Sequence, residues 1–433
     1  MNDTKRLAQD DAALDKDFAD AGIFLLDLPH LGRESILNDI KAQYSSTAQR
    51  LYFTGKVRAG AAHSVYLLGC LKPDGTLDPD FGENGITSGH FSMQSESGGT
   101  SITVLPDGKI LLLGRVFGNS VPALARFTSD GTRDLEFGGD DGYVILRMPD
   151  AAEDPIQSAA SDMNESQDSS TSVIPLDEGK ILVTRTYVVS HLADTRAYLF
   201  VLNRDGSLDT SFNQKGYVQV IYPGADQTHV VLRGGFLDKD GTIVVVGNLR
   251  PAPLSARPLM ARYTRDGQPD ARFGTGGFFI PTQELPEFGH LNAVIGQPNN
   301  RLLGIGATDD GQGLLISLEP DGKYNIQFNG AKPLLTQLGN ITYWAAGAMQ
   351  PDGKIVLCGA IAPADKSMLG VVARLLSDGT LDETFHGRGW VATQVNGRTF
   401  FNALTLQNDK KIVAAGVQRT DGNAEGVILR YLS

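Results

Sequence analysis

Side chains that could do acid–base chemistry are spread thinly along this sequence. Its seven histidines are scattered over 433 residues, and none lies in HExxH; CxxC, GxSxG and GxxxxGK[S/T] do not occur either. The short motifs of zinc proteases, redox pairs, hydrolases and P-loops are therefore missing. Catalytic residues stay unknown at this level, because a site gathered one residue at a time from distant segments leaves no motif.

Three side chains near the most varied segments are candidates for binding: His90, His290 and Tyr343. His290 and Tyr343 both align with Phe400 of a later repeat, so packing is the alternative reading of these two. The carboxylates raise the question of metal binding. Loops such as residues 74–78 (DGTLD) put two Asp side chains four residues apart.

Paired carboxylates of this kind could bind calcium. Calcium takes about six to eight oxygen ligands, and the loops lack the dense Asp/Asn alternation of an EF-hand. We therefore predict no metal site and no cofactor, with a structural calcium ion as the alternative.

The elements that would position these side chains emerge from an internal repeat. An Asp-Gly pair recurs at 74–75, 130–131, 205–206, 266–267, 321–322 and 378–379, and a segment such as LDETFHGRGWV follows each pair. A seventh copy of that segment, LDKDFADAGIF, occupies residues 14–24. A second motif such as PDGKIVLCG alternates with the first, also seven times, with a period of about sixty residues.

Each unit predicts four short antiparallel strands, because the residues alternate and β-branched types are frequent. In the last complete unit these strands are residues 390–395, 401–407, 411–417 and 427–432. One segment, RESILNDIKAQY at 33–44, has a helix-like period instead. Seven such units predict an all-β fold, a seven-bladed β-propeller, because radial packing leaves only short, protected sheet edges.

The two chain ends complete one repeat between them. The C-terminal VILRYLS stops where DGxLDxxF should follow, and the N-terminal segment supplies LDKDF. We therefore predict that the two terminal segments join and close the ring. The propeller would be a single domain over residues 14–433, preceded by a tail at 1–13.

The repeated residues fit a structural role. Gly379 allows a positive φ at a turn, and Asp382 can cap a short helical turn. Arg374 and its equivalents on the fourth strand could pair with an acidic residue of the connection. The same structural role is assigned to Asp78 and to the aromatic anchors Phe18, Phe81, Phe137, Phe212, Phe273, Phe328 and Phe385.

The two alternating motifs resemble the delta-60 repeat of bacterial proteins, whose pattern is close to PDGKIVVAG…ARYxxDGxLDxxFGxxG. The resemblance covers about residues 14–433 and implies a propeller-like β-fold. It implies no activity, because that family carries none that is established. The departures are PNNRLLG for the PDGK turn, YNIQF for LDxxF, and a worn first unit.

One face of the ring should be regular and the other varied. In a four-stranded meander the PDGK hairpins and the DGxLDxxFG crossings emerge on one face, and the remaining loops on the other. Those remaining loops differ widely, as loops that carry function on a rigid scaffold do. The longest insertion, 148–172, has six acidic residues and no Lys or Arg; we interpret it as a solvated loop, with an acidic docking surface as the alternative.

Composition narrows the choice of partner and compartment. The charge balance is 38 − 50 = −12, which opposes nucleic acid or an anionic membrane as the main partner. The apolar runs are too short for a membrane span, and no signal-peptide core is seen. We expect a cytoplasmic monomer, with signal-independent export as the alternative. Cys70 and Cys358 should be buried free thiols.

Two function classes remain. The first is a non-catalytic binding or scaffold propeller that presents its variable face to a protein or carbohydrate partner. The alternative is a propeller enzyme, a hydrolase or lyase that could act on glycans, with its catalytic residues gathered at the central channel. We favour the first, because the repeats explain nearly all distinctive residues. Two or three ionisable residues in perturbed environments at one channel mouth would reverse that preference.

Overall fold

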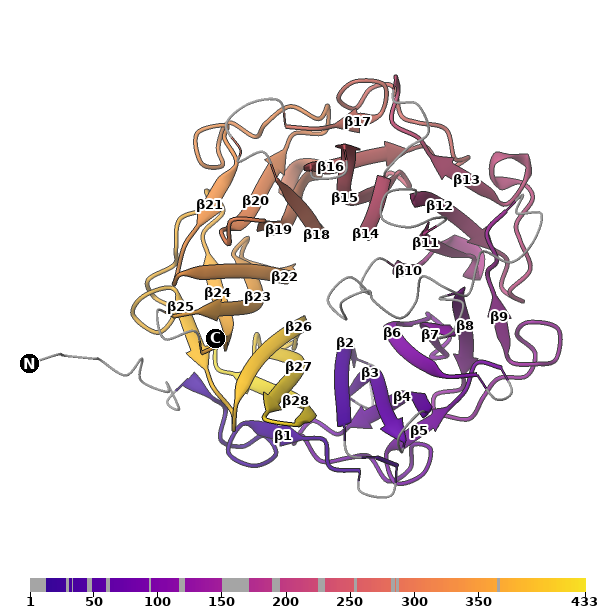
Figure 1. Cartoon of the computed structure of the whole chain (residues 1–433), viewed down its shortest axis with the longest axis vertical. Helices are drawn as coiled ribbons and strands as arrows, with labels where there is room; N and C mark the ends of the chain where they lie inside the picture. Colours follow the sequence, from indigo (N-terminus) through magenta and orange to yellow (C-terminus); the bar gives the residue numbers. More distant parts are fainter. Residues whose placement is uncertain are drawn as a thin grey trace, which may run out of the picture.

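The fold is a ring of seven four-stranded antiparallel sheets around a central axis (Figure 1). It is seen in a computed structural model that describes residues 13–28, 31, 32, 34–44, 49–59, 63–92, 95–116, 121–149, 171–188, 195–224, 230–252, 255–281, 285, 288–363 and 367–433. In each sheet we count the strands from the axis outward, so that the first strand lies nearest the axis. The predicted seven-bladed β-propeller is confirmed.

We number the blades 1 to 7 in chain order. The strands of blades 1 to 4 are β2 (Glu34–Tyr44), β3 (Gln49–Ala59), β4 (His63–Leu71), β5 (Ile86–Gly89); β6 (Ser97–Val104), β7 (Ile110–Val116), β8 (Val121–Phe127), β9 (Tyr143–Ile145); β10 (Thr171–Pro175), β11 (Ile181–Val188), β12 (Thr195–Leu202), β13 (Tyr217–Val220); β14 (Val230–Leu237), β15 (Ile243–Ala252), β16 (Ser255–Tyr263) and β17 (Phe278–Phe279).

The remaining blades follow the same order from the axis outward. Their strands are β18 (Gly289–Gln297), β19 (Arg301–Thr308), β20 (Gly313–Leu318), β21 (Leu334–Thr336); β22 (Ile341–Met349), β23 (Ile355–Ala362), β24 (Leu369–Leu375), β25 (Trp390–Thr393); β26 (Arg398–Leu406), β27 (Ile412–Thr420), β28 (Asn423–Tyr431) and β1 (Ile23–Leu25). The helical elements of the described chain are short 3-10 turns: η3 (Asp177–Gly179), η4 (Phe212–Gln214) and η5 (Pro298–Asn300).

The N-terminal segment closes the ring, as predicted. β1 is the outer strand of blade 7 and pairs antiparallel with β28, with Ile23 opposite Leu429. Just before it, Asp15 N–H donates to Arg430 O and Leu432 N–H donates to Ala13 O. Blade 7 is thereby built from both ends of the chain, so no outer sheet edge is left without its strand.

The hydrophobic core is divided in the same way as the ring. Seven clusters of buried apolar side chains lie at the seven junctions between neighbouring blades, including the junction of blades 7 and 1. The cluster between blades 6 and 7 contains Cys358, and the cluster between blades 1 and 2 contains Cys70. Both cysteines are free and buried, as predicted, and burial raises the pKa of the Cys70 thiol to about 12.

Two details differ from the sequence reading. Within the segment 33–44, the described residues Glu34–Tyr44 form a strand, β2, rather than a helix. A bulge between Leu37 and Asp39 shifts the alternation by one residue, so Leu37 and Ile40 are both buried three positions apart. In addition, the repeat and the blade are out of phase: residues 390–393 form β25, the outer strand of blade 6, rather than the first strand of blade 7.

Candidate functional site

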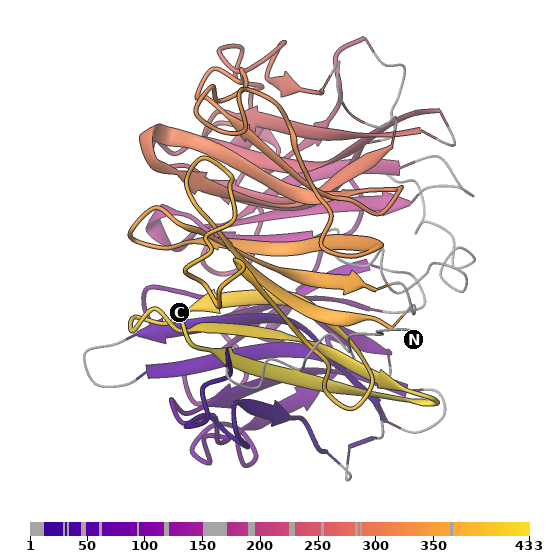
Figure 2. The ribbon, with the colours of Figure 1, turned by 90° about the vertical axis from the view of Figure 1, so that its left-hand side faces the viewer.

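The two faces of the ring follow from the meander of each blade. The turn between the first and second strands and the connection between the third and fourth strands emerge on one face, which we call the regular face. The other loops emerge on the opposite face, the variable face. Figure 2 shows the ring from the side, with the strands running from one face to the other.

On the regular face, the repeated charged residues pair with one another. In blade 6, Arg374 Nε lies 2.7 Å from Asp382 Oδ2, and Lys354 Nζ lies 2.9 Å from the same oxygen. The Arg374 guanidinium also lies 4.8 Å over the Phe385 ring. The predicted pairing of arginine with the connection is thus confirmed, and it recurs at Arg126–Asp134, Arg262–Asp270 and Arg430–Asp15.

These pairs fix the charge of the carboxylates. Burial acts to raise the pKa of Asp382, but bonds from Thr384, Lys354 and Arg374 outweigh it and hold the pKa far below its usual range. For Asp270 the hydrogen bond from Arg272 is the main cause, and the pKa falls to about 2. The carboxylates of Asp382 and Asp270 therefore stay ionised at neutral pH and act as acceptors in the scaffold.

The regular face also ties each blade to the next through the Asp-Gly turns. The carbonyl of the turn Asp accepts a backbone N–H from the preceding connection at Ala19–Asp74, Gly82–Asp130, Gly138–Asp205, Asn213–Asp266, Gly274–Asp321 and Asn329–Asp378. Blade 7 has no such turn, because the chain ends there. At that junction His386 Nε2 instead lies 3.3 Å from Leu432 O.

The motif residues singled out in the sequence all lie in this scaffold. Gly379 has φ 92°, and a Cβ there would meet the Phe328 ring at 3.0 Å. Asp78 Oδ2 lies 2.9 Å from Arg50 Nη2. The aromatic anchors are at most 3% exposed: Phe18, Phe81, Phe137, Phe212, Phe273, Phe328 and Phe385.

The Asp-Gly loops use their carboxylates within the protein. Asp74 Oδ1 accepts hydrogen bonds from the backbone N–H and the hydroxyl of Thr76. Within the described ranges, no three His, Cys, Asp or Glu side chains are grouped closely enough to hold a metal ion. The acidic insertion at 148–172 lies almost entirely outside the described residues.

On the variable face, His90 lies apart from the other two candidates. It lies between β5 and β6, and its Nδ1 is 2.6 Å from Ser95 O. Its backbone carbonyl accepts a bond from Arg133 Nη2 at 2.7 Å. These contacts indicate that His90 stabilises its own loop.

His290 and Tyr343 are brought together across two blades. His290 lies at the start of β18 and Tyr343 at the start of β22, and their ring centroids are 6.1 Å apart. The His290 side chain is 17% exposed, and its Nδ1 lies 3.7 Å from Asp309 Oδ1. Burial lowers the pKa of His290 in spite of Asp309, and the nearby cations Arg233 and Arg250 act in the same direction.

Arg233, Arg250 and Asp309 were missed in the sequence. Arg233 lies on β14, Arg250 on β15, and Asp309 in the loop after β19. Burial lowers the pKa of Arg233, and the charge of Arg250 lowers it further, whereas Tyr343 and Asp309 oppose the shift. We call these five residues of blades 4, 5 and 6 the axial cluster: Arg233, Arg250, His290, Asp309 and Tyr343.

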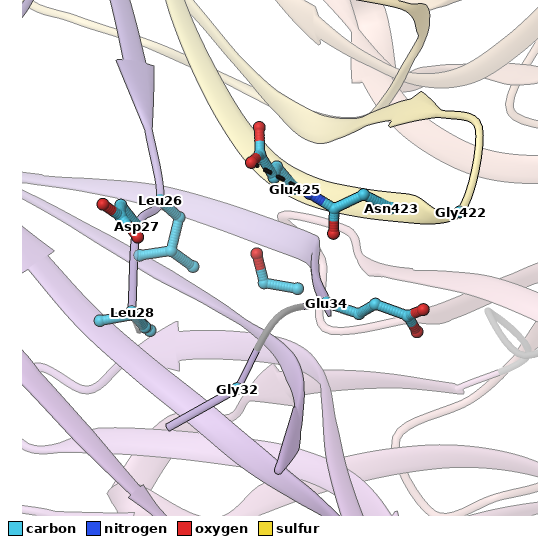
Figure 3. A pocket seen from close by; sticks show the side chains of 9 residues that line it. Leu26, Asp27, Leu28, Gly32, Glu34, Gly422, Asn423 and Glu425 are labelled. Atoms are coloured by element: carbon cyan, nitrogen blue, oxygen red, sulfur yellow. Dashed lines mark hydrogen bonds between the residues drawn. The ribbon is translucent and has the colours of Figure 1, made fainter. Parts of the chain in front are cut away.

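A cavity of about 470 Å³ opens elsewhere, at the seam between blades 7 and 1 (Figure 3). Its acidic side chains include Glu34 and Glu425. Glu34 pairs with Arg58 at 3.1 Å, and Glu425 accepts bonds from Asn423 and Gln418. Two of its carboxylates are therefore engaged in contacts within and between strands near the closure.

Four segments of the chain match a family described as "Domain of unknown function (DUF5122) beta-propeller": residues 105–137, 179–212, 239–273 and 350–385. Each of these segments ends on an aromatic anchor of the regular face. The chain is a propeller-repeat protein. None of the curated proteins compared with it matches. No helix in the described part is long and apolar enough to cross a membrane.

The solved structures that match this chain are distant from it in sequence. The polysaccharide lyase Uly1 is 9% identical, with 91% of this chain and 89% of that chain covered and a TM-score of 0.44. A PL25 ulvan lyase is 8% identical, with coverage of 92% and 96% and a TM-score of 0.44. An α-L-arabinanase of Penicillium chrysogenum is 11% identical, with coverage of 76% and 91% and a TM-score of 0.43. At this distance the likenesses say nothing about what this chain binds.

Proposed function

We propose that the protein is a monomeric binding propeller that holds a carbohydrate or protein ligand at the axial cluster on its variable face. The observation that carries the proposal is the gathering of Arg233, His290 and Tyr343 from three inner strands. On the regular face, by contrast, the repeated arginines and aspartates are engaged with one another. A rigid ring lets such side chains converge on a ligand without straining the blades.

A screen followed by mapping tests this function. The wild-type protein is applied to an array of neutral and acidic oligosaccharides and, in parallel, to a pull-down with candidate proteins. Tyr343→Ala and His290→Ala should each weaken a captured ligand by roughly tenfold or more, since central contacts dominate binding energy. Arg265→Asn is the matched control, because Arg265 is exposed on the regular face and its one ion pair among the described residues is with Asp177. Equal loss in the control would contradict the proposal.

The state of His290 favours a second candidate, a lyase acting on acidic glycans. A lowered pKa keeps the imidazole neutral near pH 7, so it can accept a proton. Elimination would move the C5 proton of a uronate to that base, break the C4–O bond, form a C4=C5 double bond and put a proton on the leaving oxygen. The axial cluster is thus a group of ionisable residues in perturbed environments, which is the feature that would favour an enzyme over a binding propeller.

Binding stays the first candidate because of the geometry around that base. The 3.7 Å between His290 Nδ1 and Asp309 Oδ1 is too long for a hydrogen bond, so the carboxylate does not fix the ring. The two candidates separate in one assay. Incubation with uronate-containing oligosaccharides that produces shorter, ultraviolet-absorbing products would favour the lyase, and intact ligand recovered with the protein would favour binding.

A further inference from the structure

Arg233 occupies a position that recurs around the ring. Six inner strands carry a β-bulge at the same level, and the extra residue of each bulge is Asn38, Thr100, Arg233, Asn292, Ala345 or Asn402. The three asparagines do the same thing. Each donates its Nδ2 to a carbonyl on the inner strand of the next blade: Asn38 to Gly99 at 2.7 Å, Asn292 to Trp344 at 2.9 Å, and Asn402 to Leu37 at 2.8 Å.

Arg233 departs from this pattern and gains little in return. Its residue is 9% exposed, so most of the side chain is taken out of water. Among the described residues its one hydrogen bond runs from Nε to Asn248 Oδ1 at the long distance of 3.5 Å, and no carboxylate lies within ion-pair range. Asn248 is itself 1% exposed, and its Nδ2 has no partner in the described structure.

Such an arrangement is costly unless something completes it. Arginine carries five N–H donors, and a buried cation is tolerated when it is paired and hydrogen-bonded. Four buried arginines of the regular face obey that rule, namely Arg126, Arg262, Arg374 and Arg430, each of which lies within 3 Å of an aspartate oxygen. Among the described residues, the Arg233 guanidinium therefore keeps unused N–H donors on the variable-face side of blade 4.

The charges nearby define what would fit. Arg250 lies close enough to lower the pKa of Arg233, and Asp309 close enough to oppose that shift. With His290 neutral, the two cations and one carboxylate of the axial cluster give its described residues a charge of 2 − 1 = +1. A single negative charge balances that excess, whereas a phosphate dianion would overshoot it.

We propose that Arg233 and Asn248 form an oxyanion subsite for the carboxylate of an acidic sugar or other organic acid held at the axial cluster. The planar fork of a guanidinium matches the two oxygens of a carboxylate, and the buried Asn248 positions that fork by accepting from Arg233 Nε. The inference rests on the proposed function and adds to it the charge that the ligand must carry.

The repeat itself supplies the variant for testing this. Arg233→Asn restores the residue found at three equivalent bulges, where the introduced amide can donate to Leu291 O of the next blade. Arg233→Lys keeps the charge and removes the fork, and Arg265→Asn makes the same chemical change on the regular face. The probes are glucuronate, glucose as the uncharged arm, and inorganic sulfate, titrated calorimetrically into each folded variant.

Glucuronate should bind the wild type and the Arg265→Asn protein equally, bind Arg233→Asn about 10- to 100-fold more weakly, and bind Arg233→Lys with an intermediate loss. An affinity for Arg233→Asn within twofold of the wild type would overturn the subsite. Glucose binding as tightly as glucuronate would overturn the charge requirement and leave the proposed function standing. Sulfate binding as tightly as glucuronate would overturn the carboxylate assignment. Failure of every array ligand to bind would instead count against the proposed function.

Discussion

Arg262 and Arg233 lie on two strands of the same blade and are almost equally buried, at 5% and 9% exposed. Arg262 has an aspartate at 2.9 Å, a phenylalanine ring at 4.9 Å and the Pro320 carbonyl of the next blade at 2.6 Å. Arg233, within the part of the chain that the structure describes, has one long hydrogen bond, to the Asn248 amide. The same residue type thus completes the scaffold on the regular face and leaves open donors on the variable face. Whether a buried arginine is fully paired therefore distinguishes a candidate binding residue from a structural residue more clearly than its residue type does.

The largest effect should come from removing the strand that closes the ring. Deleting residues 1–25 removes β1, the buried Phe18 and the Asp15–Arg430 pair. We expect a loss of more than about 5 kcal/mol of unfolding free energy, because a buried pair and a buried aromatic are each worth about 3–5 kcal/mol. Urea denaturation followed by circular dichroism measures it. A deletion of residues 1–12 is the control, and equal stability of the two truncations would contradict closure by this segment.

A single anchor of the regular face should come next. Phe385→Ala should cost about 3–5 kcal/mol, because a fully buried ring is replaced by a cavity. Phe400→Ala is the comparison, since Phe400 is only half-buried near the variable-face end of β26. If urea denaturation shows the same loss of unfolding free energy for both substitutions, the regular face does not contribute more to stability than the variable face.

The paired carboxylates predict sensitivity to acid. The pKa of Asp270 is about 2 in the folded protein, below the ordinary value of 3.8, and the pKa values of Asp15, Asp134, Asp209 and Asp382 are also lowered. Between about pH 4 and pH 2 the unfolded chain therefore binds more protons, so stability should fall as the pH falls through this window. Denaturation at pH 7, 4 and 3 checks this, and Asp270→Asn should flatten the slope. A slope unchanged in that variant would remove Asp270 from the explanation.

The smallest effect, and the one of opposite sign, belongs to Arg233. Arg233→Asn should leave stability unchanged or raise it by about 0.5–1.5 kcal/mol, because an incompletely paired charge gives way to a hydrogen bond between blades. Arg262→Asn should be strongly destabilising, since it leaves Asp270 without its buried partner. Thermal melts of both variants in the absence of ligand compare them. A destabilised Arg233→Asn would mean that Arg233 is part of the scaffold.

The sequence predicts the scaffold well because each of its contacts recurs. Arg374, Asp382 and Phe385 stand at fixed spacing in a repeat, and the chain ends together supply the missing copy, so blade number and closure are both readable. The bulge in β2 could not be read, since one extra residue mimics a helical period at Leu37 and Ile40.

The axial cluster was only partly predictable. His290 and Tyr343 stood out near varied loops, but their contact across two blades depends on the ring. Arg233 could have been found by aligning the inner strands, because it replaces the asparagine seen at Asn38, Asn292 and Asn402. Asp309 and Arg250 have no repeated equivalent to depart from, so only the fold brings them together. His90 shows the converse, a polar residue near a varied loop that braces that loop.

We propose that the variable face binds the ligand and that the contacts of the regular face stabilise the ring. A crystal structure of the wild-type protein grown with glucuronate, or with the oligosaccharide that an array selects, tests it most directly. We expect a carboxylate within about 3 Å of the Arg233 guanidinium, with the sugar beside His290 and Tyr343. Ligand density confined to the Asp-Gly turns and PDGK hairpins of the regular face would contradict it.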